Sequence, residues 1–122
     1  SATEEVLPQM ESSVDAKDLM DWALKEIDPS LKIMGPLAFD NSISNHAAKM
    51  KGIDNQVAGN ANILLVPNIE TGNSLVKMLV NFSDATAGGF VTGSNIPVVI
   101  TSRSDSLDSR LSSISNAVLS IQ

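Results

Sequence analysis

The sequence predicts an α/β domain in which helices cover both faces of a mixed, mostly parallel sheet, giving three layers. Segments with a helical period alternate along the chain with short apolar segments typical of strands. The run ILLV within residues 61–67 is apolar without interruption, which favours a strand covered on both faces. At 122 residues the chain can bury a core, and with three Phe, one Trp and no Tyr that core must consist of Leu, Ile, Val, Met and Ala.

The first expected helix is capped by Ser13 or Asp15 and runs to about Ile27. Leu19, Ala23 and Ile27 recur four residues apart and form one apolar stripe. The helix should stop at the Asp-Pro pair that follows, because a residue before proline avoids the helical region.

The middle of the chain is expected to be mostly extended. Residues 31–39 are interrupted by a Gly-Pro pair, and residues 61–67 form the buried strand. Between them a short helix over about residues 43–50 should close at Gly52, since glycine tolerates the left-handed backbone that ends helices.

The last third is expected to contain two helices around a pair of strands. Thr71 or Asn73 caps a helix that runs to about Phe82. GGFVTG and PVVIT are the strands, and the tight reversal between them favours an antiparallel pair. A final helix over about residues 106–121 has one apolar face, which consists of Leu107, Leu111, Ile114 and Val118.

Composition excludes several classes of function. A net charge of −6 argues against general nucleic-acid binding, which depends on neutralising phosphates. There is no cysteine, so disulfides and thiolate chemistry are excluded, and a cytoplasmic location is expected. No apolar run approaches the roughly 18–20 residues of a membrane span, and SATEEVLPQM does not have the features of a signal peptide.

The single histidine, His46, is expected to be a surface residue of a short helix. A Ser–His–Asp hydrolase would have to use it, but the chain has no G-x-S-x-G motif. A metal site is not expected either, because His46 has no His or Cys neighbours and no clustered carboxylates at ligand spacing.

Both arginines of the chain lie in NIPVVITSRSDSLDSRL, just after an expected strand and around the start of the last helix. Ligands collect at such strand ends, and the fork of Arg103 beside the Ser102 hydroxyl suits a phosphate or carboxylate. The alternative is structural: Ser102 or Ser106 caps the helix, while Arg103 and Arg110 pair with the nearby acids, Asp105 and Asp108.

Two further polar positions allow two interpretations each. Asp40, which with Asn41 follows GPLAF, is either a polar site at a strand end or part of a capping pair for the next helix. Gly72 and Asn73 in PNIETGNSL either leave room for a ligand or start a helix.

Four stretches together resemble one family: SATEEV, GPLAFDNSIS, AGNANILLVPNIETGN and AGGFVTGSNIPVVITSRSDS. Their order and spacing are similar to the C-terminal part of the phosphate acetyl- and butyryltransferases, and the T-S-R-x-D-S ending is closer to the butyryl branch. The resemblance implies two α/β domains like those of isocitrate and isopropylmalate dehydrogenases, with the active site between them. Residues 1–101 would then belong to one domain, and residues 102–122 would be the strand end and helix that return toward the other.

The resemblance also implies a reaction and its residues. The family moves a short-chain acyl group between coenzyme A and inorganic phosphate, with coenzyme A as a substrate and no permanent cofactor or metal. Ser102 would stabilise the oxyanion, and Arg103 would bind phosphate. The other substrate contacts would come from Asp40, Gly72 and Asn73. This chain alone is expected to be inactive and the protein to be a homo-oligomer.

This chain departs from the family's pattern at the expected general base and at three other positions. The acetyl branch has an aspartate seven residues after the serine, where this chain has Ser109, so Asp105 and Asp108 are the available substitutes. Asn60 and Asn68 replace usual aspartates, and Asn95 replaces a common basic residue. The alternative function, a non-catalytic α/β ligand-binding or assembly domain, remains open.

Overall fold

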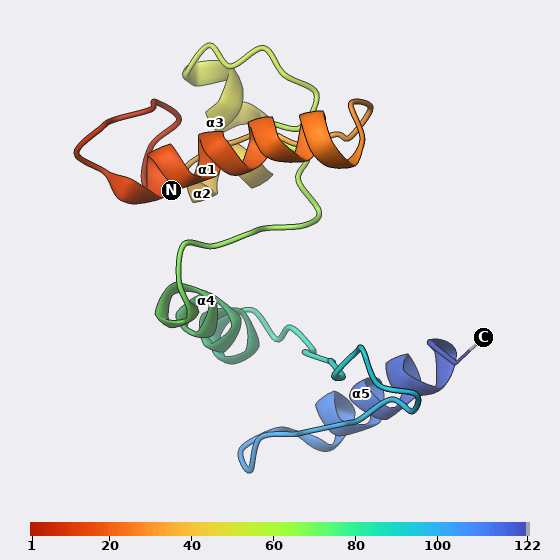
Figure 1. The fold of residues 1–122 in the computed structure, drawn as a ribbon. Coiled ribbons are helices and arrows are strands. Elements are labelled where there is room, and N and C mark those ends of the chain that lie inside the picture. The colour runs from red at the N-terminus through yellow and green to blue at the C-terminus, as the bar shows by residue number, and fades with distance from the viewer. Residues whose placement is uncertain (122) are drawn as a thin grey trace. The chain divides into compact units, whose positions relative to one another are not determined.

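The computed structural model describes residues 1–121 and divides the chain into two compact units, Ser1–Thr71 and Gly72–Gln122 (Figure 1). Its elements, in chain order, are helix α1 (Glu11–Trp22), π-helix η1 (Ala23–Ile27), α2 (Phe39–Ile43), α3 (Asn45–Met50), α4 (Ile69–Phe82) and α5 (Leu107–Leu119). Across residues 1–121, no helix combines the length and the apolar character needed to cross a membrane.

The first helix begins earlier than its expected cap. Ser13 lies inside the first turn of α1 and is fully buried. Its Oγ accepts a hydrogen bond from the Leu7 N–H at 2.9 Å and donates one to the Met10 carbonyl at 2.8 Å. The prediction that Ser13 or Asp15 caps the helix is therefore wrong, because Ser13 ties the preceding loop to the helix instead.

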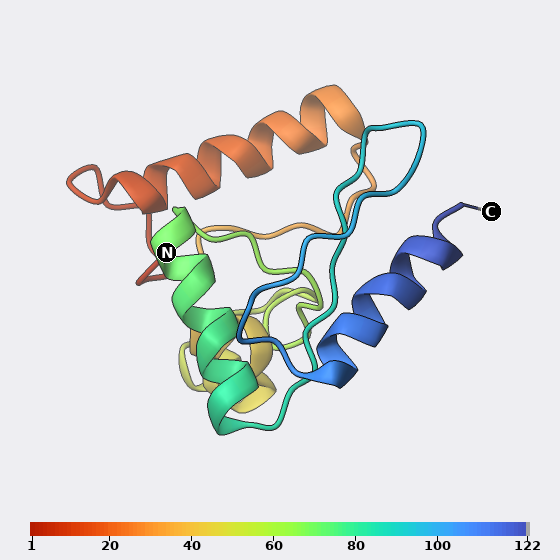
Figure 2. The same ribbon diagram turned by 90° about the horizontal axis from the view of Figure 1, so that it is seen from below.

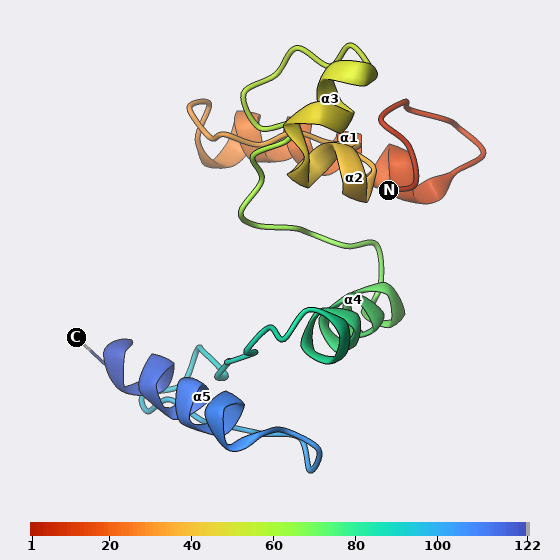
Figure 3. The same cartoon turned by 180° about the vertical axis from the view of Figure 1, so that it is seen from behind.

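The ends of two helical segments in the first unit are as predicted, whereas helix α2, Phe39–Ile43, was not predicted. The helical path ends at Ile27, and Asp28 is extended with φ −159°. Ser44 caps α3 by accepting the Ala47 N–H, and Gly52 follows the end of that helix with φ +67°. α2 and α3 contact each other and form a short, angled pair (Figure 3).

α4 starts about one turn before the expected caps. The Oδ1 of Asn68 accepts hydrogen bonds from the N–H and the hydroxyl of Thr71, at 2.9 and 2.7 Å. Asn68 therefore performs the capping that was assigned to Thr71 or Asn73, and both of those residues lie within α4. The predicted end of this helix at Phe82 is correct.

In the second unit the chain leaves α4, runs out to a turn and returns to α5 (Figure 2). α5 buries a face of small residues, Ser109, Ser113 and Ala117. The Ser113 Oγ accepts a hydrogen bond from the Gly89 N–H at 3.2 Å, which fixes this face against the segment that leaves α4.

The expected sheet is not formed within residues 1–121. One isolated antiparallel bridge joins Val91 to Val98, with a 2.8 Å hydrogen bond from the Val91 N–H to the Val98 carbonyl. This bridge has the antiparallel direction expected for the two segments, but neither segment forms a strand. Residues 31–38 and 61–66 contain no ladder, because a strand exists only when a neighbouring strand satisfies its backbone groups.

The core of the described residues differs from the expected one. The buried apolar side chains other than proline are alanines: Ala23, Ala38, Ala48, Ala58 and Ala117. Large aliphatic side chains are partly or largely exposed instead, including Ile63 at 85% and Leu65 at 76% in the ILLV run. Such surface is unusual on a complete globular domain and is characteristic of faces that contact other protein.

Candidate functional site

The serine and arginine of the TSRSDS stretch lie in an ordered loop before α5. The Ser102 N–H donates a 2.7 Å hydrogen bond to the Asp105 carboxylate, and the Asp105 N–H donates one of 3.2 Å to the Ser102 carbonyl. The Ser102 and Ser104 hydroxyls lie 3.1 Å apart. Residues 102–105, called the arginine loop below, are thus closed on themselves by reciprocal bonds, and the Ser102 and Arg103 side chains are exposed.

The helix cap is a different serine. The Ser106 Oγ accepts the Ser109 N–H at 3.2 Å, so Ser106 caps α5 and leaves the Ser102 hydroxyl outside the helix. Of the two capping serines considered from the sequence, Ser106 is the correct one. Asp108 is exposed and lies in the first turn of α5. Its negative charge stabilises the helix there, because the N-terminus of a helix carries a partial positive charge.

The arginines do not pair with the nearby acids. Within residues 1–121 the ion pairs are Lys17–Asp21, Lys25–Glu26 and Lys51–Glu4, all of which involve lysine. The Nη2 of Arg110 instead donates to the carbonyl oxygen of Arg103 at 3.3 Å. The structural alternative, with Arg103 and Arg110 held by acids, is therefore wrong for the described residues.

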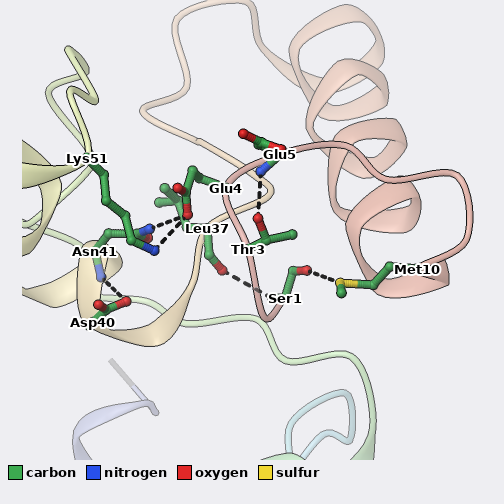
Figure 4. Close-up of polar contacts among 9 residues, drawn as sticks. All are labelled: Ser1, Thr3, Glu4, Glu5, Met10, Leu37, Asp40, Asn41 and Lys51. Carbon is green, nitrogen blue, oxygen red and sulfur yellow. Dashed lines mark hydrogen bonds and ion pairs between the residues drawn. The ribbon is translucent and has the colours of Figure 1, made fainter.

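A second polar cluster lies in the first unit, at the start of α2 (Figure 4). The Oε2 of Glu4 accepts hydrogen bonds from the Asn41 Nδ2 at 3.0 Å and from the Lys51 Nζ at 2.9 Å. The hydrogen bond from Lys51 lowers the pKa of Glu4 and raises that of Lys51. We call these three residues the Glu4 cluster.

Asn41 is the buried centre of the Glu4 cluster. Its side chain is 0% exposed, and its Oδ1 has no hydrogen-bond partner among the described residues. The Asn41 carbonyl accepts the Gly59 N–H at 2.8 Å, so this residue joins three separate parts of the chain. Asp40 is exposed, and its carboxylate accepts the Asn41 N–H at 2.8 Å. Asp40 and Asn41 therefore lie inside α2 rather than capping the next helix, which Ser44 caps.

The remaining candidates lie on helices. Gly72 and Asn73 are both within α4, so they neither form a loop nor start a helix. His46 is exposed on α3, as predicted. Among residues 1–121, no three residues of the types His, Cys, Asp and Glu form a group that could hold a metal ion.

Asn60 and Asn68, which the resemblance places at positions of usual aspartates, both have structural roles. Asn68 caps α4 as described, and the Asn60 Oδ1 accepts from the Asn45 Nδ2 at 3.0 Å. An amide at position 60 can exchange hydrogen bonds with another amide, since it both donates and accepts.

The Glu4 cluster was not found from the sequence. Its members are separated by 37 and 47 positions, so no local period connects them. The one available signal is that Glu4 and Asn41 each lie in a stretch that carries the family resemblance, SATEEV and GPLAFDNSIS.

Known proteins match nearly the whole chain. A phosphate acetyltransferase of Rhizobium meliloti is 44% identical over 98% of this chain and 38% of its own length. A probable phosphate butyryltransferase of Bacillus subtilis is 43% identical over 97% of this chain and 40% of its own length. The chain thus spans about two fifths of these relatives.

A solved structure and a family profile agree with these relatives. The crystal structure of a branched-chain phosphotransacylase from Enterococcus faecalis V583 matches all of this chain and 44% of its own, with a TM-score of 0.87 and 38% identity. That likeness is in keeping with the predicted α/β class. The profile described as phosphate acetyl/butaryl transferase matches residues 1–118. The chain therefore belongs to the phosphate acetyl/butyryltransferase family.

Proposed function

We propose that this chain is part of a phosphate acyltransferase, which converts acyl-CoA and inorganic phosphate into an acyl phosphate and coenzyme A. The observation that carries the proposal is the family match over residues 1–118. The chain spans about two fifths of its curated relatives, so the activity is proposed for the longer protein that contains it.

Arg103 is the proposed phosphate-binding residue and Ser102 the proposed oxyanion donor. The exposed Arg103 guanidinium forms no ion pair within residues 1–121, so its planar fork is available for two phosphate oxygens. The exposed Ser102 hydroxyl lies outside the helix cap. It can donate to the oxygen that becomes negative when the acyl carbon turns tetrahedral.

The reaction also needs a group that exchanges a proton with the coenzyme A sulfur. When coenzyme A attacks the acyl phosphate, a base removes the thiol proton, sulfur bonds to the acyl carbon, and phosphate leaves with the bonding electrons. A thiol with a pKa of about 8.5 is mostly protonated at neutral pH, so the base matters. We assign this role to Asp108, because one carboxylate oxygen of Asp105 holds the arginine loop closed.

Asp40, Gly72 and Asn73 are proposed to contact substrate as well. Asp40 and Asn73 are exposed, and Gly72 is half-buried within α4. The family stretches GPLAFDNSIS and AGNANILLVPNIETGN contain all three.

The wider protein is proposed to have the two-domain architecture of isocitrate and isopropylmalate dehydrogenases. In it, this chain would form the C-terminal portion, residues 1–101 one α/β domain, and residues 102–122 the return toward the other. The exposed, unpaired ILLV run supports this, because it would pair with strands outside the chain and complete the three-layer sheet. A cytoplasmic homo-oligomer is proposed.

The acyl group is proposed to be short, and the butyryl branch is favoured by the T-S-R-x-D-S ending. The probable phosphate butyryltransferase of Bacillus subtilis, 43% identical to this chain, also supports a short-chain acyl group.

Thiol release from butyryl-CoA and acetyl-CoA by the full-length protein, with and without phosphate, tests the function. Phosphate-dependent turnover within about 1–1000 per second is expected. This chain alone should give none, because positioning catalysis fails when part of the site is missing. Tight binding of coenzyme A or phosphate without turnover would instead indicate a ligand-binding protein.

A further inference from the structure

We infer that Arg110 is a positioning residue for Arg103, and that it acts by holding the peptide of the phosphate-binding residue from the body of α5. The inference rests on the proposed function. The Arg110 Nη2 donates to the Arg103 carbonyl oxygen at 3.3 Å, from seven positions further along the chain. The sequence did not predict this contact of Arg110.

Arg110 is attached to a rigid support. Its backbone N–H donates to the Ser106 carbonyl at 3.1 Å, as the first regular helical bond after the cap. The side chain thus spans from α5 back to the arginine loop. Because a guanidinium has five donors in a fixed plane, one can hold a carbonyl while the others stay available.

The arginine loop needs such a support at Arg103. The reciprocal bonds between Ser102 and Asp105 fix the two ends of the loop. Between them, the peptide that joins Arg103 to Ser104 is held on both sides: its N–H donates to the Ser102 Oγ at 3.4 Å, and its carbonyl accepts from Arg110 at 3.3 Å, which is the bond that anchors it to α5. Fixing that peptide limits the directions in which the long Arg103 side chain can extend, and this pre-organises its fork for phosphate.

A double-mutant cycle in the full-length protein tests the inference. The measured quantity is kcat/KM for phosphate at saturating acyl-CoA, for Arg110→Met, Arg103→Ala and the double variant. Arg110→Met should lower it about tenfold, mainly through the KM for phosphate, which is the scale of one hydrogen bond from a charged group. In the Arg103→Ala background, Arg110→Met should change it by less than about twofold, since the residue that it positions is gone.

Two further variants separate positioning from charge. Lys77→Met removes one exposed positive charge from α4 and should leave kcat/KM for phosphate unchanged within about twofold. Arg110→Lys keeps a charge and a donor and should recover part of the loss.

Equal losses from Arg110→Met in both backgrounds would show that Arg110 acts on phosphate independently, and would overturn the inference. No loss from Arg110→Met in an active protein would also overturn it while leaving the proposed function intact. An inactive full-length wild type would overturn the proposed function, and this inference with it.

Discussion

The side-chain amide of Asn41 donates a 3.0 Å hydrogen bond to Glu4, a residue 37 positions earlier in the chain, and Lys51 donates to the same carboxylate oxygen at 2.9 Å. One carboxylate therefore connects the N-terminal segment to α2 and to the residue that ends α3. Exposed ion pairs contribute little to stability, but in the pair of Glu4 and Lys51 the carboxylate also accepts a hydrogen bond from the buried amide of Asn41.

The first prediction concerns the stability of the chain in acid. The pKa of Glu4 is lowered in the folded state, so its contribution is present above the unfolded pKa of about 4.5 and is lost as the pH falls through the folded value. Urea unfolding from pH 7 down to pH 3 should show this loss. Glu4→Gln should be less stable than wild type at pH 7, and the difference should shrink in acid. A difference that stays constant with pH would contradict the assignment.

The second prediction concerns the buried amide. Asn41→Asp places a second carboxylate about 3 Å from Glu4 in a site with no solvent contact, and should cost about 3 kcal/mol or more at pH 7. Asn41→Ala should cost less, about 1–2 kcal/mol, because it removes the donor together with the unpaired Oδ1. Urea unfolding of both variants gives the order. Burial and the nearby Glu4 charge raise the pKa of the new carboxyl above its ordinary value, so the penalty of Asn41→Asp should shrink as the pH is lowered from 7 toward about 4, where the protonated acid can donate to Glu4.

The third prediction compares two glycines with left-handed backbones. At Gly59, φ is +80° and an added Cβ would lie 2.6 Å from the Asn45 Cα, whereas at Gly52, φ is +67° and no atom lies within 4 Å. Gly52→Ala should cost only the left-handed strain, about 1–2 kcal/mol. Gly59→Ala adds a collision with backbone and should cost clearly more, as measured by thermal unfolding. Equal costs at the two positions would show that the loop at Gly59 moves away without penalty.

The fourth prediction separates the two acids near the arginine loop in the full-length protein. Asp108→Asn should lower kcat by about 100-fold or more with little change in the KM for phosphate, as expected for a lost general base. Asp105→Asn retains an oxygen that can accept the Ser102 N–H, so it should have a smaller effect on kcat. Initial rates over a range of phosphate concentrations, at saturating acyl-CoA, give kcat and the KM for phosphate of each variant. The reverse order would assign the base to Asp105.

The sequence predicted local features well, because local rules determine them. Proline ended the first helical path at Ile27, Gly52 followed α3, and Ser106 capped α5. Each of these outcomes depends on a few neighbouring residues. The predicted cap of α4 was wrong by about one turn, because Asn68 precedes Thr71 and caps the helix in its place.

The larger features that failed depend on partners that are distant in the sequence. The sheet was predicted from apolar runs, but a run such as ILLV shows only that a segment can pair, and within residues 1–121 it forms no ladder. The Glu4 cluster joins residues 37 and 47 positions apart, which no periodicity connects. At the arginine loop the sequence placed Ser102 and Arg103 together, but it could not distinguish a carbonyl from a carboxylate as the partner of Arg110.

The fifth prediction follows from the two faces of α5. Periodicity correctly defined an apolar face, but the structure covers the opposite one, where Ser113 accepts the Gly89 N–H. The apolar face is between 51% and 71% exposed and consists of Leu107, Leu111, Ile114 and Val118. Covering such side chains is worth roughly 1.5–3 kcal/mol each, which is enough to drive association of this chain through α5.

Sedimentation velocity at low micromolar concentration should therefore show a dimer or a larger oligomer. Leu111→Glu and Ile114→Glu should each shift the chain to monomer, because a carboxylate in the contact would lose its hydration. Ser115→Glu is the matched control, since it adds the same charge at an exposed polar position of α5 and should leave the oligomer intact. Circular dichroism must show the same helical content in all three variants. A wild-type monomer, with the glutamate variants equally soluble and folded, would show that the apolar face of α5 does not mediate self-association.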